Sequence, residues 1–237
     1  MKTFITLLLC LITSPLFATG FPEYYYEIKE KKRQHEEFGK ILMPFIKKAN
    51  KTILTDREFV KSFFNKALTK GLRDVSLGEL KRLVRLKKRY RIKNLYDRKS
   101  YLERIDKIPI SLAIAQAAVE SGWGTSRFVK LANNIFGHWT WGDKGIIPLN
   151  REEGKTHKIR IFDSLSDSVE AYMLNLNRHN AYQEFRKQRE FFRKTNKKFN
   201  GLEAAKTMLY YSELREKYVE MLQDSMRKNN FLYYDAD

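Results

Sequence analysis

The chain has 237 residues, of which 43% are hydrophobic and 31% are charged. This balance supports a folded chain with one good-sized core and excludes wholesale disorder. The formal net charge of +18 favours an anionic polymer as partner, without deciding between nucleic acid, membrane headgroups and cell-wall glycan.

Residues 1–20 show the pattern of a signal peptide. Lys2 supplies a short positive region, residues 4–12 form an apolar run, and small residues follow near a plausible cleavage site. The apolar run is short for a membrane span, and Cys10, the single cysteine, follows a leucine instead of the small residue that lipidation favours. We therefore expect export to the periplasm or cell envelope, which favours envelope polymers over nucleic acid as partners.

The segment 21–101 is predicted to be a basic helical arm. Apolar residues at helical spacing predict one helix that is interrupted or begun at Pro44, and a second that runs from about Asp56 to Gly71. Because no linker rich in Pro, Gly or Ser follows, we expect the arm to pack on a domain formed by residues 102–237.

A third helix of the arm is predicted to begin at Ser76 and to continue through the basic run at residues 87–99. This run is either a contact surface for an acidic polymer or a solvated helix face. Both interpretations predict an exposed basic helix.

Residues 108–124, with the sequence IPISLAIAQAAVESGWG, predict a buried helix that ends in a glycine turn around Trp123. Gln116 and Glu120 interrupt the apolar surface and share one face, because they are four residues apart. Burial disfavours the charged form of a carboxyl group, so the pKa of Glu120 should rise. A carboxyl that stays protonated can donate its proton to a leaving oxygen. The alternative is a helix-end glutamate that bonds only to nearby backbone.

The segment 132–145, with the sequence ANNIFGHWTWGDKG, places amides and aromatic rings between glycines. Asn134, Phe136, Trp139 and Trp141 suit a groove that stacks against sugar rings. The alternative is that these rings fill the core.

Residues 146–162 predict the one hairpin of the chain, with a polar turn at residues 152–154. Its tip carries Glu152 and Glu153, either of which could be the second carboxylate that glycoside hydrolysis usually needs. The alternative is a charged hairpin tip without a role in catalysis.

The remaining chain is predicted to be helical, with helices over residues 164–178 and 183–194, a short one after Gly201, and a last one whose buried face includes Leu214 and Leu222. The fold class is therefore mainly α with one small hairpin. The four histidines lack the spacing of a metal site, and motifs for a serine nucleophile or a phosphate-binding loop are missing from the sequence. We expect neither a cofactor nor a metal.

The motif AQAAVESGWGTS followed by NNIFG resembles the glucosaminidase-domain family, the mannosyl-glycoprotein endo-beta-N-acetylglucosaminidase-like enzymes that cut peptidoglycan. The run from NNIFGHWTW through residues 154–186 is similar in particular to the Bax-type members. The resemblance covers about residues 108–232 and implies a lysozyme-like helical core with a small β-lobe. It implies that Glu120 is the catalytic acid, that Glu153 or Glu152 is a second acidic residue, and that Tyr211 assists.

We therefore expect an exported peptidoglycan hydrolase that cleaves N-acetylglucosaminyl β-1,4 bonds, acts as a monomer, and contacts anionic envelope polymers or a membrane surface peripherally. Alternatives are a lytic transglycosylase, an amidase, a wall-binding protein without turnover and, on charge alone, a nucleic-acid-binding protein. The expected substrate-binding residues are Gln116, Trp123, Asn134, Phe136, Trp139, Trp141 and Glu152.

Overall fold

The structure is a computed structural model that describes residues 20–149, 151 and 153–236. The predicted signal peptide, apart from Gly20, lies outside the described residues, and so does Glu152. Within the described ranges, every helix is too short or too polar to cross a membrane.

The described chain is mainly helical and has one two-stranded antiparallel sheet, which confirms the predicted fold class. Three 3₁₀ turns lie at Leu72–Asp74, Asn180–Tyr182 and Phe231–Asp235. The strands are β1 (Trp139–Thr140) and β2 (Lys158–Ile159). The helices are α1 (Glu23–Glu27), α2 (Lys31–Lys70), α3 (Leu77–Arg89), α4 (Arg98–Arg104), α5 (Ile110–Ser121), α6 (Arg127–Ala132), α7 (Leu165–Arg178), α8 (Gln183–Lys194), α9 (Gly201–Lys206) and α10 (Glu216–Lys228).

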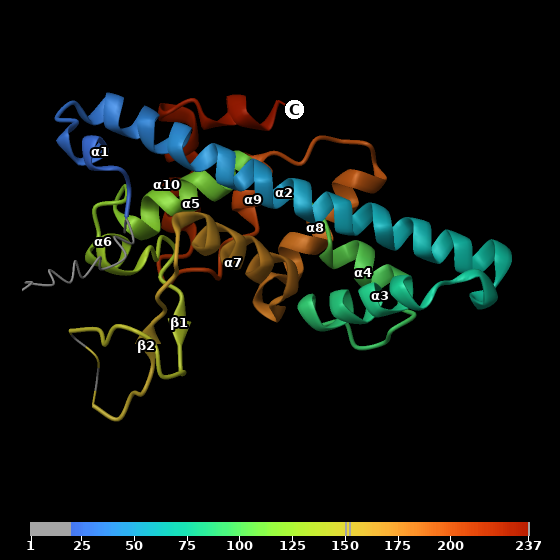
Figure 1. Ribbon diagram of the computed structural model, residues 1–237. Coiled ribbons are helices and arrows are strands. Elements are labelled where there is room, and N and C mark those ends of the chain that lie inside the picture. The colour runs from blue at the N-terminus through green and yellow to red at the C-terminus, as the bar shows by residue number, and fades with distance from the viewer. Residues whose placement is uncertain (1–19, 150, 152, 237) are drawn as a thin grey trace, which may run out of the picture.

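Helix α2 runs along the molecule as one continuous element (Figure 1). The predicted break at Pro44 and the separate helix from Asp56 are therefore wrong. Pro44 is exposed, so water can satisfy the carbonyl that its missing N–H leaves free. The buried side of α2 continues past it, from Phe38 through Ile46 to Phe63, and packs against α4, α5 and α7. This packing outweighs the cost of about 3 kcal/mol for an interior proline.

Helix α3 ends earlier than predicted, so the basic run at residues 87–99 is not one exposed helix. Arg91 adopts a left-handed backbone conformation with φ 53°. The amide of Ile92 donates to the carbonyl of Lys87 at 2.9 Å, which is the hydrogen bond of a Schellman C-cap. Tyr90 and Ile92 are buried, and their burial favours this turn although the left-handed residue is not a glycine.

Helix α5 is the central helix of the fold, and its burial confirms the prediction from its sequence. Residues 110–118 are all buried, and α5 packs against α2, α9 and α10. Figure 1 shows α5 beneath α2, with α7 alongside. The hydrophobic core is continuous from Phe21 through Ile114 to Phe231, so the packing crosses the expected boundary between the arm and the later domain.

The small sheet projects from the helical body at the lower left of Figure 1. The predicted pairing within residues 146–162 is present, because Ile146 and Ile159 exchange backbone hydrogen bonds of 2.8 and 2.9 Å. The sequence did not reveal that β2 also pairs with β1, with Trp139 opposite Ile159. The side chain of Asn134 donates to the carbonyls of His138 and Arg160, so one buried amide joins the bases of the two strands.

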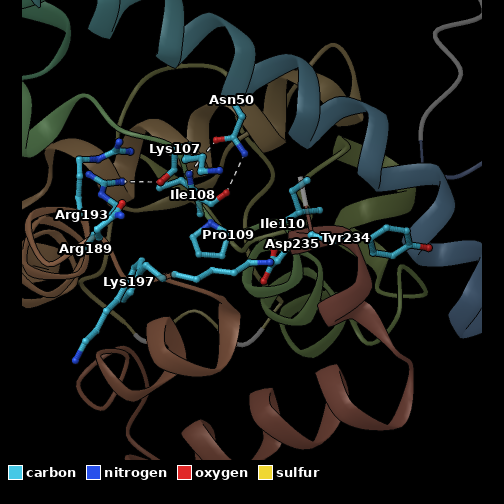
Figure 2. Close-up of a pocket in the computed structure, with 14 residues that line it drawn as sticks. Asn50, Lys107, Ile108, Pro109, Ile110, Arg189, Arg193, Lys197, Tyr234 and Asp235 are labelled. Carbon is cyan, nitrogen blue, oxygen red and sulfur yellow. Dashed lines mark hydrogen bonds between the residues drawn. The ribbon is translucent and has the colours of Figure 1, made fainter.

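The buried segment that leads from α4 into α5 is held by side chains of other helices. Arg57 donates to the carbonyls of residues 102 and 105, and Arg189 donates to those of residues 103, 104, 106 and 107. Asn50 exchanges hydrogen bonds with both backbone groups of Ile108 (Figure 2). These bonds satisfy backbone groups of this connection that have no partner in a helix or strand.

Gly201 allows α9 to cross closely over the start of α5. A Cβ atom there would lie within 2.9 Å of the backbone nitrogen of Leu112 and against the side chains of Ser111 and Met226. We expect Gly201→Ala to lower the free energy of unfolding by about 1–3 kcal/mol through overpacking, measured by urea denaturation. Gly78→Ala in α3 is the matched control, because its nearest neighbour lies 3.9 Å away. It should be neutral or stabilising by about 0.5 kcal/mol, and equal effects of the two variants would contradict this packing.

Candidate active site

Glu120 lies in the last turn of α5 and is half-buried. The helix ends because Gly122 adopts the left-handed conformation, with φ 54°. The chain then turns tightly, and the amide of Gly124 donates to the hydroxyl of Ser121 at 2.7 Å. The glycine turn predicted from the sequence therefore places one carboxyl group at the end of an apolar helix.

A chain of hydrogen bonds with a fixed direction leads to this carboxyl. Tyr172 of α7 donates its hydroxyl proton to the amide oxygen of Gln116. The Gln116 nitrogen donates to the hydroxyl oxygen of Tyr218 at 3.1 Å, and Tyr218 of α10 donates to Oε1 of Glu120 at 2.7 Å. Because Gln116 occupies an acceptor position of Tyr218, the Tyr218 proton points to Glu120. The acidic proton of Glu120 is then carried on its other oxygen, Oε2.

The surroundings of Glu120 favour its protonated form. Burial raises the pKa of the carboxyl, and the hydrogen bond from Tyr218 opposes this rise by stabilising the charged form. The net direction is upward. The pKa rise predicted from the sequence thus agrees with the structure, and its cause is the predicted one.

Three tyrosines besides Tyr218 share the electrostatic environment of Glu120. Burial and then the Glu120 charge raise the pKa of Tyr182 to about 12, and the same two causes raise the pKa of Tyr211. The pKa of Tyr172 is also raised, chiefly by burial. The Tyr211 ring stacks on that of Tyr218, with centroids 5.3 Å apart. These hydroxyls stay protonated at neutral pH and can act as hydrogen-bond donors.

The structure places several predicted substrate-binding residues inside the protein. Gln116 is fully buried in the hydrogen-bond chain. Phe136 is buried and stacks on Tyr172 with centroids 3.9 Å apart. Asn134 is buried at the base of the sheet, whereas Trp123 is half-buried and stacks on His35 with ring centroids 3.4 Å apart. These residues pack and form hydrogen bonds around the site instead of presenting a surface to a ligand.

Other predicted residues lie on the projecting sheet and its loop. Trp139 and Trp141 are 56% and 71% exposed, and the Trp139 ring stacks on His157 with centroids 4.2 Å apart. Glu153 is exposed. Flat aromatic surfaces open to solvent on this sheet are the part of the predicted groove that a sugar can reach.

A cavity of about 470 Å³ lies away from this carboxyl, at the start of α5. Ile110 lines it, and Glu120 is ten residues further along the helix, a rise of about 15 Å. Figure 2 shows Arg189 and Arg193 on one side of Pro109 and Asp235 on the other. Arg189 is occupied by the carbonyls of the loop before α5. This cavity borders structural groups and is separate from the Glu120 site.

The sequence analysis missed Tyr218, Tyr172 and Tyr182 as members of the site. Tyr218 lies in the predicted last helix and Tyr172 in the helix predicted over residues 164–178, and neither was named as a site residue. The polar Gln116 on an otherwise apolar helix was the available signal, because a buried amide needs hydrogen-bond partners from other helices.

We expect Tyr218→Phe to move the alkaline limb of the activity profile to higher pH. A general acid loses activity as pH rises through its pKa, and the Tyr218 hydrogen bond lowers the pKa of Glu120. Removing the hydroxyl therefore raises this pKa further. The measurement is the pH dependence of kcat/KM on purified peptidoglycan, with the exposed Tyr233→Phe as control. A limb that stays in place or moves to lower pH would show that Tyr218 does not tune the acid.

A family model, a relative and a solved structure are similar to this chain. Residues 97–231 match the family model described as mannosyl-glycoprotein endo-beta-N-acetylglucosaminidase. Protein bax of Escherichia coli strain K12 is 33% identical over 199 residues, which cover 80% of this chain and 69% of that protein. The crystal structure of the catalytic domain of the autolysin Auto from Listeria monocytogenes is similar with a TM-score of 0.42 and 20% identity, over 74% of this chain and 87% of that one.

Proposed function

The chain belongs to the glucosaminidase family, and on that premise we propose that it hydrolyses the N-acetylglucosaminyl β-1,4 bonds of peptidoglycan. The observation that carries this proposal is the half-buried Glu120, whose pKa is raised by burial and whose Oε1 is held by Tyr218. A carboxyl whose pKa is raised by burial is suited to protonate a glycosidic oxygen.

In the first step Glu120 transfers the proton on Oε2 to the oxygen between the two sugars, and the glycosidic bond breaks. The Tyr218 hydroxyl then stabilises the glutamate anion that forms, because it already donates to Oε1. This hydrogen bond strengthens as the charge develops, so it favours the transition state over the ground state. Tyr211 is protonated at neutral pH and supplies a further donor for developing negative charge.

In the second step water attacks the sugar, and two routes are consistent with the residues. Glu153 could activate the water as the hairpin-borne carboxylate, or the acetamido group of the substrate could assist from within the substrate. The exposed position of Glu153 on the projecting segment would require the substrate to bring it near Glu120. The rate of Glu153→Gln separates the routes: a large loss supports the first, and little change supports the second.

The place of action that we propose is the cell envelope, reached through the signal-peptide pattern of residues 1–20. The substrate there is polymeric and anionic, which suits the net charge of +18. The exposed Trp139 and Trp141 are proposed to stack on its sugar rings.

The test is digestion of purified peptidoglycan by the full chain, with the products analysed by mass spectrometry. Hydrolysis predicts products with a new reducing N-acetylglucosamine end and the mass of one added water. Anhydro-sugar ends would assign a lytic transglycosylase instead, and free peptides would assign an amidase. Binding to the wall without release of fragments would leave a wall-binding protein.

A further inference from the structure

A second cavity, of about 500 Å³, lies beside the base of the small sheet. Its walls come from the sheet, from the outer side of α7 and from the end of α3. Its lining includes three arginines and three carboxylates, namely Arg89, Arg160, Arg178, Asp163, Asp167 and Glu170. Such a volume accommodates a ligand of a few hundred daltons, and both signs of charge line it.

Arg178 is the strongest indication of a ligand in this cavity. Its Nε is buried and, within the described part of the chain, has no hydrogen-bond partner. Its Nη1 donates only weakly to the carbonyl of Arg89, at 3.4 Å. Burial lowers the pKa of Arg178, and the charges of Arg91, Arg89 and Arg160 lower it further. Arg178 is half-buried, and a guanidinium among like charges favours an anion.

His138 is placed in the same positive environment. Burial lowers its pKa to about 4, with Arg160 and Arg178 as the further causes, so the ring is neutral at physiological pH. Its Nδ1 is also buried and lacks a partner among the described residues. Asn134 fixes this residue and Arg160 through their backbone carbonyls. Two residues of the cavity lining, Arg178 and His138, therefore each have one buried polar atom without a partner among the described residues.

The carboxylates of the lining have their own, weaker attachments. Asp167 accepts the hydroxyl of Ser164 at 2.7 Å, and Glu170 lies 4.0 Å from the Nζ of Lys48. Both carboxylates are reachable by solvent, since Asp167 is exposed and Glu170 half-buried. A ligand with both charges can place an ammonium group on these carboxylates and an anionic group on the arginines.

We propose that this cavity binds a short zwitterionic peptide, with its carboxylate on Arg178 and Arg160 and its ammonium toward Asp163 and Glu170. A simple anion would use the arginines and leave the acidic side without a partner. A peptide with both charges uses the whole lining. This inference rests on the proposed function in one respect: under that function the ligand is the peptide stem that peptidoglycan glycan strands carry.

The cavity is linked to the Glu120 site through packed side chains. Tyr172 belongs to the hydrogen-bond chain of Glu120, Phe136 stacks on Tyr172, and the ring of His138 lies 6.2 Å from that of Phe136. Two ring contacts thus separate the two sites.

The test is calorimetric titration of the wild-type full chain with a synthetic tripeptide that has one free amine and free carboxylates. We expect binding that weakens about 10-fold or more in Arg178→Gln and in Arg160→Gln, because each loses a charge-assisted hydrogen bond. Arg33→Gln, an exposed arginine of α2, is the matched control and should bind like wild type. Melting temperatures of all variants confirm that each is folded.

Two chemical variants of the peptide test the two charges separately. Amidated carboxylates and an acetylated amine should each weaken binding about 10-fold. The inference is overturned if the peptide does not bind, if Arg178→Gln leaves the affinity unchanged, or if inorganic phosphate competes fully with the peptide. Because the tripeptide contains no sugar, these outcomes are independent of turnover. Failure of the wild type to digest peptidoglycan would overturn the proposed function alone.

Discussion

Glu120→Gln is expected to lower kcat/KM on purified peptidoglycan about 1,000-fold, while the protein stays folded. The substitution removes the proton that a general acid donates, and general acids contribute roughly 10²–10⁴-fold. It keeps the size of the side chain and an oxygen that can accept the Tyr218 hydroxyl. The release of reducing sugar from wall preparations measures the effect, and near-ultraviolet circular dichroism verifies the fold.

The matched control for this variant is Glu220→Gln. Glu220 is exposed on α10, so losing its charge should leave turnover within about twofold of wild type, as is usual for surface changes. Full activity in Glu120→Gln would remove this carboxyl from the mechanism. Equal losses in the two variants would point to a general effect of charge on binding to the wall.

Asp106→Asn is expected to lower the free energy of unfolding by about 3–5 kcal/mol, the usual cost of breaking a buried ion pair from one side. Asp106 is 2% exposed and faces three guanidinium groups. Arg193 donates to its Oδ2 at 2.6 Å, Arg57 lies 3.5 Å from its carboxylate, and Arg189 donates to its backbone carbonyl. Asparagine keeps the shape and removes the carboxylate charge that pairs with Arg57 and Arg193. Urea denaturation measures the loss.

Asp224→Asn is the control, because Asp224 pairs with Lys228 on the exposed side of α10 and such pairs stabilise little.

The pH dependence of the free energy of unfolding provides a second test. Burial alone would raise the pKa of Asp106, but Arg189, Arg57 and Arg193 together lower it. A carboxyl with a lowered folded-state pKa stabilises the protein above its unfolded value of about 3.9 and loses this effect as pH falls through the folded-state pKa. The difference between wild type and Asp106→Asn should therefore shrink on acidification. A constant difference would contradict the assignment.

The helical body and the Glu120 helix were predictable because their signals are local. An almost wholly apolar stretch from Ile110 to Val119 can only be buried, and glycines at 122 and 124 end it. The break predicted at Pro44 failed for a reason that is not local. Whether a proline ends a helix depends on whether the exposed side of the helix can be hydrated and its buried side packed. Helices α5 and α7 supply that packing for α2.

The position of Glu120 at the end of a buried helix was predictable, and the residues that form hydrogen bonds around it were not. Glu120 is visible in the sequence as a lone carboxyl on an apolar helix. Tyr218 is 98 residues away along the chain, and Tyr172 reaches the site through Gln116. Residues separated in this way are brought together by packing of α5, α7 and α10, which periodicity within one helix does not determine. The position of exposed residues such as Trp139 depends on the pairing of β1 with β2. The sequence did not predict this pairing, because the strands are short.

The most direct test of the account is the pKa of Glu120 itself, measured through its carboxyl carbon by ¹³C NMR titration and assigned with Glu120→Gln. The account predicts a midpoint above the ordinary value of about 4.3 for glutamate, because burial outweighs the Tyr218 hydrogen bond, and a further increase in Tyr218→Phe. A midpoint at or below the ordinary value would mean that Glu120 is ionised at neutral pH and has no proton to donate, which would contradict its role as the acid.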